Sequence, residues 1–209
     1  MYSYRIKRVL DFLLSLLAMI ILFWLFIVIA VAIKLNSKGP VFFLQKRIGR
    51  DKKTFNIIKF RTMKIDTPKN IPTHLLKHPD QYITSMGKLL RKTSLDELPQ
   101  LINIIKGDMS IVGPRPALWN QYDLIAERDK YDVNHLRPGL TGWAQVNGRD
   151  EIPIEIKARL DGEYMKKLSF TFDIKCIIKT VNCVIKHEGV KEGLQEEGHY
   201  EKSTSDWSQ

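Results

Sequence analysis

Two neighbouring carboxylates in the stretch SLDELPQ, residues 94–100, are the first place where this sequence could do chemistry. Asp96 and Glu97 precede a proline and an apolar run, which allows two interpretations. They could stabilise the start of a helix, where Ser94 and Glu97 fit a capping box or Asp96 itself is the cap. Alternatively, two adjacent ionised carboxylates could act as a nucleophile and as Mg²⁺ ligands. The pair alone does not decide between these roles.

Cationic side chains near this pair favour the catalytic interpretation. Arg91 lies just upstream, and Arg115 stands between two prolines in a segment with little conformational freedom. Lys59 and Arg61 alternate with apolar residues, so in a strand they would share one face. Lys59, Arg61 and Arg115 could hold phosphate groups. The positive field of Arg91 and Lys92 is expected to keep both carboxylates ionised. The sequence therefore favours an anionic, phosphorylated substrate.

A glycine-rich polar segment, RPGLTGWAQVNGR at residues 137–149, is a further candidate for binding. It matches neither a dinucleotide-binding pattern nor a Walker pattern. A loop rich in glycine and amides can still bring backbone N–H groups and side-chain amides to a nucleotide. The candidate binding residues in it are Arg137, Thr141, Gln145, Asn147 and Arg149.

The elements that must position these residues are mostly helices. Apolar residues recur at helical spacing from residue 95 to residue 105, and Lys106-Gly107 is a typical helix end. Short runs of β-branched and aromatic residues at 41–44 and 55–58 are separated by a turn, which predicts a hairpin over 41–61. The fold class predicted is α+β, mainly helical, with one short β-hairpin.

The segment from Phe12 to Ile33 contains 22 residues without a charge. A bilayer core needs about 20 helical residues, so this segment is long enough to span it. Basic residues lie at both ends, and positive charge marks the cytoplasmic side. The helix therefore either spans the membrane or enters and returns on one face. A return requires a break, usually at Pro or Gly, and because the segment contains neither, it favours a straight helix.

The chain is strongly basic, with 33 Lys+Arg against 23 Asp+Glu. This excess favours anionic partners, namely phospholipid, nucleic acid or phosphorylated small molecules. An alternative without catalysis is therefore a membrane-anchored basic adaptor that binds anionic lipid or nucleic acid, although no nucleic-acid-binding module is recognisable. Cys176 and Cys183 lie too far apart on a helix to bridge, and we expect free thiols.

The order of the motifs gives a more specific prediction. KFRTM, TSLDELPQLINIIKGDMSIVGPRP and RPGLTGWAQVNGR follow an N-terminal KRVLDF. This pattern resembles the small monotopic phosphoglycosyl transferases of the bacterial sugar transferase family. The resemblance implies transfer of a phospho-sugar from a UDP-sugar to polyprenyl (undecaprenyl) phosphate at the cytoplasmic face of the bacterial inner membrane, with release of UMP. Such a reaction begins the assembly of capsule, O-antigen, exopolysaccharide or glycoprotein glycans.

The resemblance also implies a role for each candidate residue. Asp96 would be the nucleophile that holds a covalent phospho-sugar, and Asp96 and Glu97 would bind Mg²⁺, the expected cofactor. The expected phosphate ligands are Lys59, Arg61, Arg91 and Arg115, and the segment from Arg137 to Arg149 would shape the nucleotide and sugar pocket. The partners implied are UDP-sugar, polyprenyl phosphate and membrane phospholipid, without nucleic acid. A homodimer is compatible with the sequence, which leaves the sugar and the pathway open.

One departure from the family lies in the membrane segment. Family members break this helix at a Ser-Pro pair and form a re-entrant hairpin, whereas the corresponding position here is Phe23-Trp24. The segment could re-enter, lie at a shallow angle or span with Met1 outside, and we favour re-entry. The predicted organisation is a membrane-anchoring helix at 1–38, a cytoplasmic catalytic domain at 39–190 and a flexible tail at 191–209. Residues 172–186 predict an amphipathic helix, lying either in the membrane interface or against the core.

Overall fold

The computed structural model of the chain describes residues 4–67, 81–148 and 152–185. In chain order the elements are α1 (Tyr4–Ile21), α2 (Phe23–Asn36), β1 (Phe42–Ile48), the 3-10 helix η1 (Arg50–Lys52), β2 (Thr54–Phe60), α3 (Ser85–Lys92), the 3-10 helix η4 (Leu95–Glu97), α4 (Gln100–Lys106), β3 (Ser110–Val112), α5 (Tyr122–Asp129), the 3-10 helix η5 (Val133–His135), β4 (Gly139–Thr141), α6 (Trp143–Val146), α7 (Ile154–Lys166) and α8 (Phe170–Ile185).

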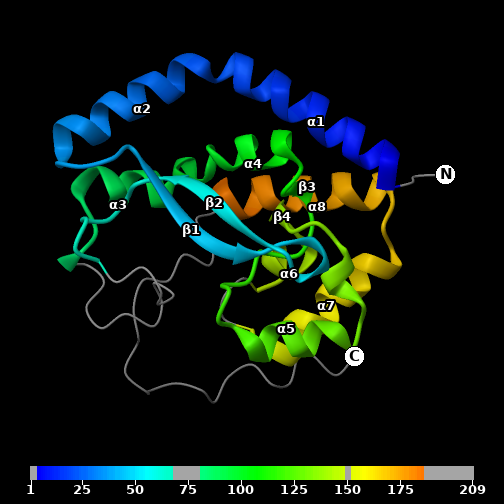
Figure 1. Ribbon diagram of the computed structural model, residues 1–209. Helices are drawn as coiled ribbons and strands as arrows, with labels where there is room; N and C mark the ends of the chain where they lie inside the picture. The colour runs from blue at the N-terminus through cyan, green and yellow to red at the C-terminus, as the bar shows by residue number, and fades with distance from the viewer. Residues whose placement is uncertain (1–3, 68–80, 149–151, 186–209) are drawn as a thin grey trace.

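The first two helices form an arch along one side of the molecule (Figure 1). Beneath the arch lie α3, α4 and the β1–β2 hairpin, and α5 and α7 lie on the far side of the molecule. The predicted class, mixed helix and sheet with mainly helices and a two-stranded hairpin, is confirmed. The domain boundaries stay predictions, and the tail at 191–209 lies outside the described residues.

The N-terminal apolar segment is not one straight helix. It bends by 63° between α1 and α2, at Leu22, where φ is −88° and ψ is 3°. The expectation of a straight helix is therefore wrong, and the break occurs without proline or glycine. Among the described residues no single helix is long and apolar enough to cross a membrane, although α1 and α2 together have the length and composition.

The inner face of α1 is polar and its outer face is apolar. Lys7, Asp11 and Ser15, spaced four residues apart, are the buried residues of the helix, whereas Leu13 and Leu17 are exposed. This polarity is the reverse of a helix packed on an ordinary core. The domain therefore holds α1 through polar contacts and leaves its apolar side uncovered.

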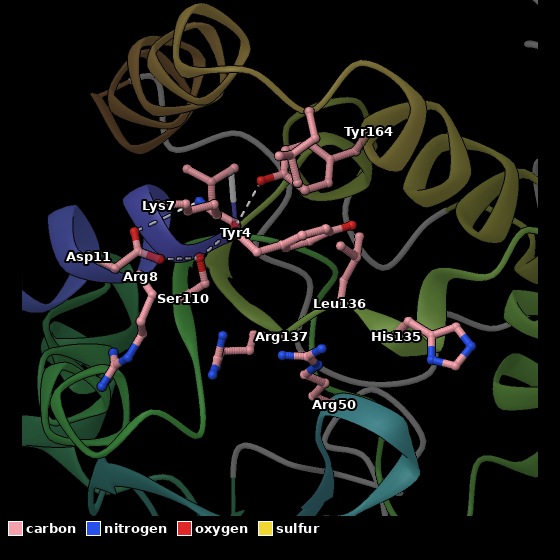
Figure 2. A pocket seen from close by; sticks show the side chains of 12 residues that line it. Tyr4, Lys7, Arg8, Asp11, Arg50, Ser110, His135, Leu136, Arg137 and Tyr164 are labelled. Atoms are coloured by element: carbon pink, nitrogen blue, oxygen red, sulfur yellow. Dashed lines mark hydrogen bonds and ion pairs between the residues drawn. The ribbon is translucent and has the colours of Figure 1, made fainter. Parts of the chain in front are cut away.

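Those polar contacts form one buried network, of which Figure 2 shows Lys7, Asp11, Ser110 and Tyr164. Lys7 Nζ lies 2.7 Å from Asp173 Oδ2 on α8, and Ser110 of β3 donates to Asp11 at 2.6 Å. Tyr164 of α7 donates to Asp173 at 2.7 Å. Four elements distant in sequence thus meet at one point, which fixes the direction in which α1 leaves the domain.

The predicted hairpin is formed by β1 and β2, which pair antiparallel with Phe42 opposite Phe60. A side-chain amide from α4 forms hydrogen bonds with the backbone of β2. Asn103 is fully buried, accepts from the backbone N–H of Ile58 at 2.9 Å and donates to the carbonyl of Asn56 at 2.8 Å. This side chain therefore bonds β2 as a neighbouring strand would.

The amphipathic helix expected at 172–186 corresponds to α8. Its outward residues include Phe170, Ile174, Ile178 and Val181, each at least 39 % exposed, whereas Cys176 on the opposite face is fully buried. The helix thus packs one face on the core and leaves an apolar stripe uncovered. Cys176 and Cys183 are free thiols, as predicted.

Candidate active site

The two carboxylates lie in the short 3-10 helix η4, which joins α3 to α4. Ser94 turns the chain with a left-handed φ of 56°, and its side chain makes no capping hydrogen bond. The helix α4 then begins at Gln100, and Pro99 occupies its N-cap position. Both capping alternatives are therefore wrong, since neither Ser94 nor Asp96 caps this helix. The tight turn instead separates Asp96 and Glu97 from the regular helix.

Glu97 is held by cations from two other elements. Lys59 Nζ, from β2, lies 2.6 Å from Glu97 Oε1, and Arg115 Nη1 lies 3.7 Å from the same oxygen. Burial acts to raise the pKa of Glu97, but the charges of Lys59 and Arg115 outweigh burial and lower it to about 2. Glu97 is therefore a carboxylate at any physiological pH.

Asp96 has the opposite environment although it is the next residue. Asp96 is buried, and burial raises its pKa to about 6. The charge of Lys59 acts to lower this pKa, whereas the negative charge of Glu97 acts to raise it further. Loss of solvation thus exceeds the attraction of the cations at Asp96, which the positive charge of the sequence did not indicate. At pH 7 about nine in ten Asp96 side chains are nevertheless ionised.

A pair of parallel strands places Arg115 at this site. The backbone N–H of Gly113 donates to Thr141 O at 2.8 Å, and that of Gly139 donates to Pro114 O at 2.8 Å. At Gly142 a Cβ would lie 2.0 Å from the carbonyl oxygen of Gly113, so only glycine allows this approach. The glycines of the 137–149 segment therefore support the loop that carries Arg115.

Arg91 lies beside the pair, whereas Arg61 serves another contact. Arg91 donates to Thr62 Oγ1 at 2.9 Å, and its charge acts to lower the pKa of Asp96. Arg61 is buried and donates to the carbonyls of Ser37 and Lys38 at 2.8 and 2.7 Å, just beyond the end of α2. Arg61 therefore joins the end of α2 to β2, and its binding of phosphate stays a prediction.

The polar residues of the 137–149 segment make their contacts within the segment, with α8 and with Gly107. Arg137 donates to Gly107 O at 2.9 Å, and the Thr141 hydroxyl lies 2.6 Å from that of Thr180. Gln145 donates to Leu140 O, and Asn147 accepts from Lys179 at 3.0 Å. Among the described residues these contacts do not reach Asp96 or Glu97. Their role in a nucleotide pocket stays a prediction, and Arg149 lies outside the described residues.

The acid pair fits Mg²⁺ by the chemistry of its donors. The described residues contain no group of three or more His, Cys, Asp or Glu side chains that could enclose a metal. Mg²⁺ does not need such a cage, because it usually keeps several waters and binds one or two carboxylates together with substrate phosphates. Asp96 and Glu97 would be its protein ligands, shared with a phosphorylated substrate.

Sequence reasoning missed one cation that supports the site. Arg47 of β1 is one of the basic residues that follow the apolar N-terminal segment. In the structure it donates to Pro116 O at 3.0 Å, and its charge acts to lower the pKa of Glu97. No pattern in the sequence indicated this contact, because it joins β1 to a loop 69 residues further along the chain.

Comparison with known proteins agrees with this geometry. Residues 2–187 match the family described as bacterial sugar transferase. The chain is 42 % identical over 200 residues to the uncharacterized sugar transferase EpsL of Bacillus subtilis strain 168, covering 93 % of this chain and 92 % of that protein. It is 34 % identical over 197 residues to the exopolysaccharide production protein ExoY of Sinorhizobium fredii, covering 88 % and 87 %.

A longer relative has a more specific name. The chain is 42 % identical over 185 residues to the UDP-glucose:undecaprenyl-phosphate glucose-1-phosphate transferase of Escherichia coli strain K12, covering 84 % of this chain but 39 % of that protein. The match to the family extends over nearly the whole chain and includes every described residue of the site. The chain therefore belongs to the bacterial sugar transferase family and is a transferase.

Proposed function

We propose that this protein transfers a sugar-1-phosphate from a UDP-sugar to undecaprenyl phosphate in exopolysaccharide or related glycan synthesis, and that Asp96 is the nucleophile. The observation that carries the proposal is the contrast within the acid pair. Burial raises the pKa of Asp96 more than its neighbouring cations lower it, whereas Glu97 forms ion pairs with Lys59 and Arg115. The names of the relatives supply the substrate class.

The reaction proceeds in two steps. An oxygen of Asp96 forms a bond to the phosphorus that carries the sugar, and the bond from that phosphorus to the bridging oxygen breaks, so UMP leaves with the electron pair. An oxygen of undecaprenyl phosphate then attacks the same phosphorus. The Asp96–phosphorus bond breaks, which yields the undecaprenyl diphospho-sugar and restores the carboxylate.

The chain's own residues position and neutralise the substrate. Lys59 and Arg115 converge on Glu97 from two elements, so their charges lie beside Asp96 where the diphosphate must approach. Mg²⁺, when bound by Asp96 and Glu97, would neutralise charge on the diphosphate and on the leaving UMP. Poor solvation makes the Asp96 carboxylate more reactive than an exposed aspartate, since less hydration must be lost in the attack.

The proposal places the protein at the cytoplasmic face of the inner membrane. The uncovered apolar side of α1 and the exposed stripe of α8 support this, since an undecaprenyl chain is insoluble in water. The 63° bend at Leu22 lies where the family breaks its re-entrant helix, and it supports re-entry rather than a span. Polar residues on the inner side of α1 would then stay against the domain.

The test is UMP release from UDP-sugars by the full chain in nanodiscs that contain undecaprenyl phosphate and Mg²⁺. UDP-glucose and UDP-N-acetylgalactosamine come first, because relatives are named for them. Asp96→Asn should abolish UMP release, whereas Asp66→Asn, an exposed aspartate outside the site, should leave it unchanged. Without undecaprenyl phosphate, the donor should leave a phospho-sugar mass on the intact wild-type chain and none on Asp96→Asn. Turnover that survives in Asp96→Asn would overturn the nucleophile.

A further inference from the structure

Three arginines from distant parts of the chain converge on a pocket at the other end of α4 (Figure 2). Arg8 comes from α1, Arg50 from the turn of the hairpin, and Arg137 from the segment that leads into β4. Arg8 donates to the carbonyl of Ile105 in the last turn of α4 at 2.8 Å, whereas Asp96 precedes the start of that helix. The described residues that line this pocket do not include Asp96 or Glu97, so the pocket is distinct from the acid pair.

The carboxylates near this pocket neutralise only part of its positive charge. Lys7 is neutralised, since Asp173 lies 2.7 Å from it and Asp11 lies 3.8 Å from it. Arg50 has Asp51 at 3.4 Å, and the Arg50 side chain is about half exposed. Among the described residues, neither Arg8 nor Arg137 forms an ion pair with a carboxylate.

Hydrogen bonds to backbone carbonyls at the end of α4 use only some of the N–H groups of these arginines. Arg8 uses both terminal nitrogens on the last carbonyls of α4, and Arg137 uses Nε on Gly107 O. In the described part of the chain the two terminal nitrogens of Arg137 donate to no acceptor. Burial, with the neighbouring charges of Arg50 and Arg8, lowers the pKa of Arg137, as expected where positive charges are crowded.

We propose that this pocket is a second anion site, which binds a phosphate group between Arg137 and Arg50. A guanidinium presents a planar fork of N–H groups that matches phosphate, and Arg137 has such a fork unused. The pocket is lined by Tyr4 at the start of α1, and Val9, one turn further on, is 57 % exposed. A lipid could therefore place its phosphate in the pocket and its chain along α1, whereas a small phosphate compound would use the pocket alone.

The experiment is isothermal titration calorimetry of the full chain in dodecyl maltoside, which contains no phosphate. The probes are inorganic phosphate and the short-chain lipid dihexanoyl phosphatidylglycerol. Arg50→Gln and Arg137→Gln test the pocket, and Arg159→Gln is the matched control, since Arg159 is an exposed arginine on α7. Arg115→Gln distinguishes this pocket from the acid pair, and the result is independent of any transferase activity.

We expect Arg50→Gln and Arg137→Gln to weaken binding of at least one probe about tenfold, as for one charge-assisted hydrogen bond. Arg159→Gln should bind as the wild type does, whereas Arg115→Gln should remove only phosphate that binds at the acid pair. Tighter binding of the lipid than of phosphate identifies a headgroup site, and equal binding identifies a site for phosphate compounds in general. Absence of binding by both probes, or unchanged binding by Arg50→Gln, overturns the proposal. Arg50 is exposed, so its variant keeps the test valid if Arg137→Gln fails to fold.

Discussion

The ionisation of Asp96 determines how the site responds to pH. Its pKa is raised to about 6 by burial, whereas that of Glu97 is lowered to about 2 by its cations. The pKa values of these two adjacent side chains thus differ by several units, because Asp96 loses its solvation whereas Glu97 gains ion pairs. A nucleophilic carboxylate must be ionised, so the pH dependence of the reaction should report Asp96.

We therefore predict a pH profile for the first chemical step. The rate of UMP release should be constant above about pH 7 and should fall about tenfold for each unit below about pH 6, since only ionised Asp96 attacks. The measurement is single-turnover UMP release between pH 5 and pH 8.5, with melting checked at each pH. A rate that stays constant down to pH 5 would contradict a raised pKa.

Burial of the ionised Asp96 side chain should lower the stability of the folded protein. Because its folded pKa exceeds the unfolded value of 3.8, folding binds a proton between about pH 4 and pH 6, and the stability due to Asp96 falls as pH rises through this window. The shift corresponds to about 3 kcal/mol above pH 6. Asp96→Asn should therefore melt several degrees higher than the wild type at pH 8 while it is inactive.

This prediction has an internal control. The difference in melting temperature between Asp96→Asn and the wild type should shrink as pH falls from 8 to 4.5, because folded Asp96 becomes protonated, and it should approach zero only below pH 3.8, where Asp96 is neutral in both the folded and the unfolded state. Asp66→Asn should show no such dependence, because that side chain is exposed. An Asp96→Asn protein that melts below the wild type at pH 8 would show that the carboxylate stabilises the fold.

At the scale of elements, Asn103 couples the hairpin to the helix that follows the acid pair. Its amide bonds Ile58 N and Asn56 O, and Lys59 is the next residue along β2. Asn103→Asp should destabilise the protein by about 1–3 kcal/mol, because the donor to Asn56 is lost and a carboxylate is buried. The substitution should also lower kcat by a larger factor than it changes KM, because Lys59, the neighbour of Ile58, would be positioned less firmly. Asn182→Asp, on the exposed face of α8, is the matched control in melting and turnover assays.

The bend between α1 and α2 is a second property of the elements. Around Leu22 the helical i→i−4 bonds from Leu22 N–H to Ala18 O and from Phe26 N–H to Leu22 O are kept, whereas among the described residues the N–H groups of Phe23 and Trp24 donate to no carbonyl of α1. Proline at Phe23 or Trp24 would thus fall in the first turn of α2, where no helical bond is lost. Phe23→Pro and Trp24→Pro should keep wild-type membrane recovery and melting.

Leu14→Pro is the control for this prediction. Leu14 is also exposed and apolar, but it lies inside α1, where proline removes a helical bond and costs about 3 kcal/mol. We expect that variant to be recovered poorly from membranes. Equal damage by all three prolines would indicate that the segment is straight in the membrane.

At the scale of the whole molecule, buried polar groups decide how the arch sits on the domain. Lys7→Met would leave Asp173 with Tyr164 but without its cation, which should cost about 3–5 kcal/mol. The double variant Lys7→Met with Asp173→Asn should recover part of this loss, because Asp11 is then the only one of the two carboxylates near Lys7 that is left without its cation. Lys167→Met, which breaks an exposed pair with Glu163, should cost less than about 1 kcal/mol in the same denaturation experiment.

Several elements and site residues were predictable because local patterns determine them. The helix from residue 95 to residue 106 was visible from apolar spacing, although the structure divides it into η4 and α4. The hairpin was visible from its β-branched runs and its turn. The proximity of Lys59 and Arg115 to the acid pair followed from charge and from the motif order, and the structure brings them together at Glu97.

Other properties depend on partners that are distant in sequence. No local signal showed that Arg61 would bond the end of α2, or that Arg47 would support the Pro116 loop. The raised pKa of Asp96 depends on how deeply the surrounding elements, α3 and β2 among them, bury it, which charge patterns alone cannot show. The bend at Leu22 likewise needed no proline, because contacts of α1 and α2 with the domain set their angle.

The sequence by itself therefore determined the class of fold, the family and the identity of the acid pair, because each of these is written in local periodicity, residue type and motif order. Only the tertiary structure decided which cation serves which carboxylate, which acid is poorly solvated, and that α1 turns its polar side inward. These depend on burial and on distances between segments as far apart as Lys7 and Asp173, which no local pattern records.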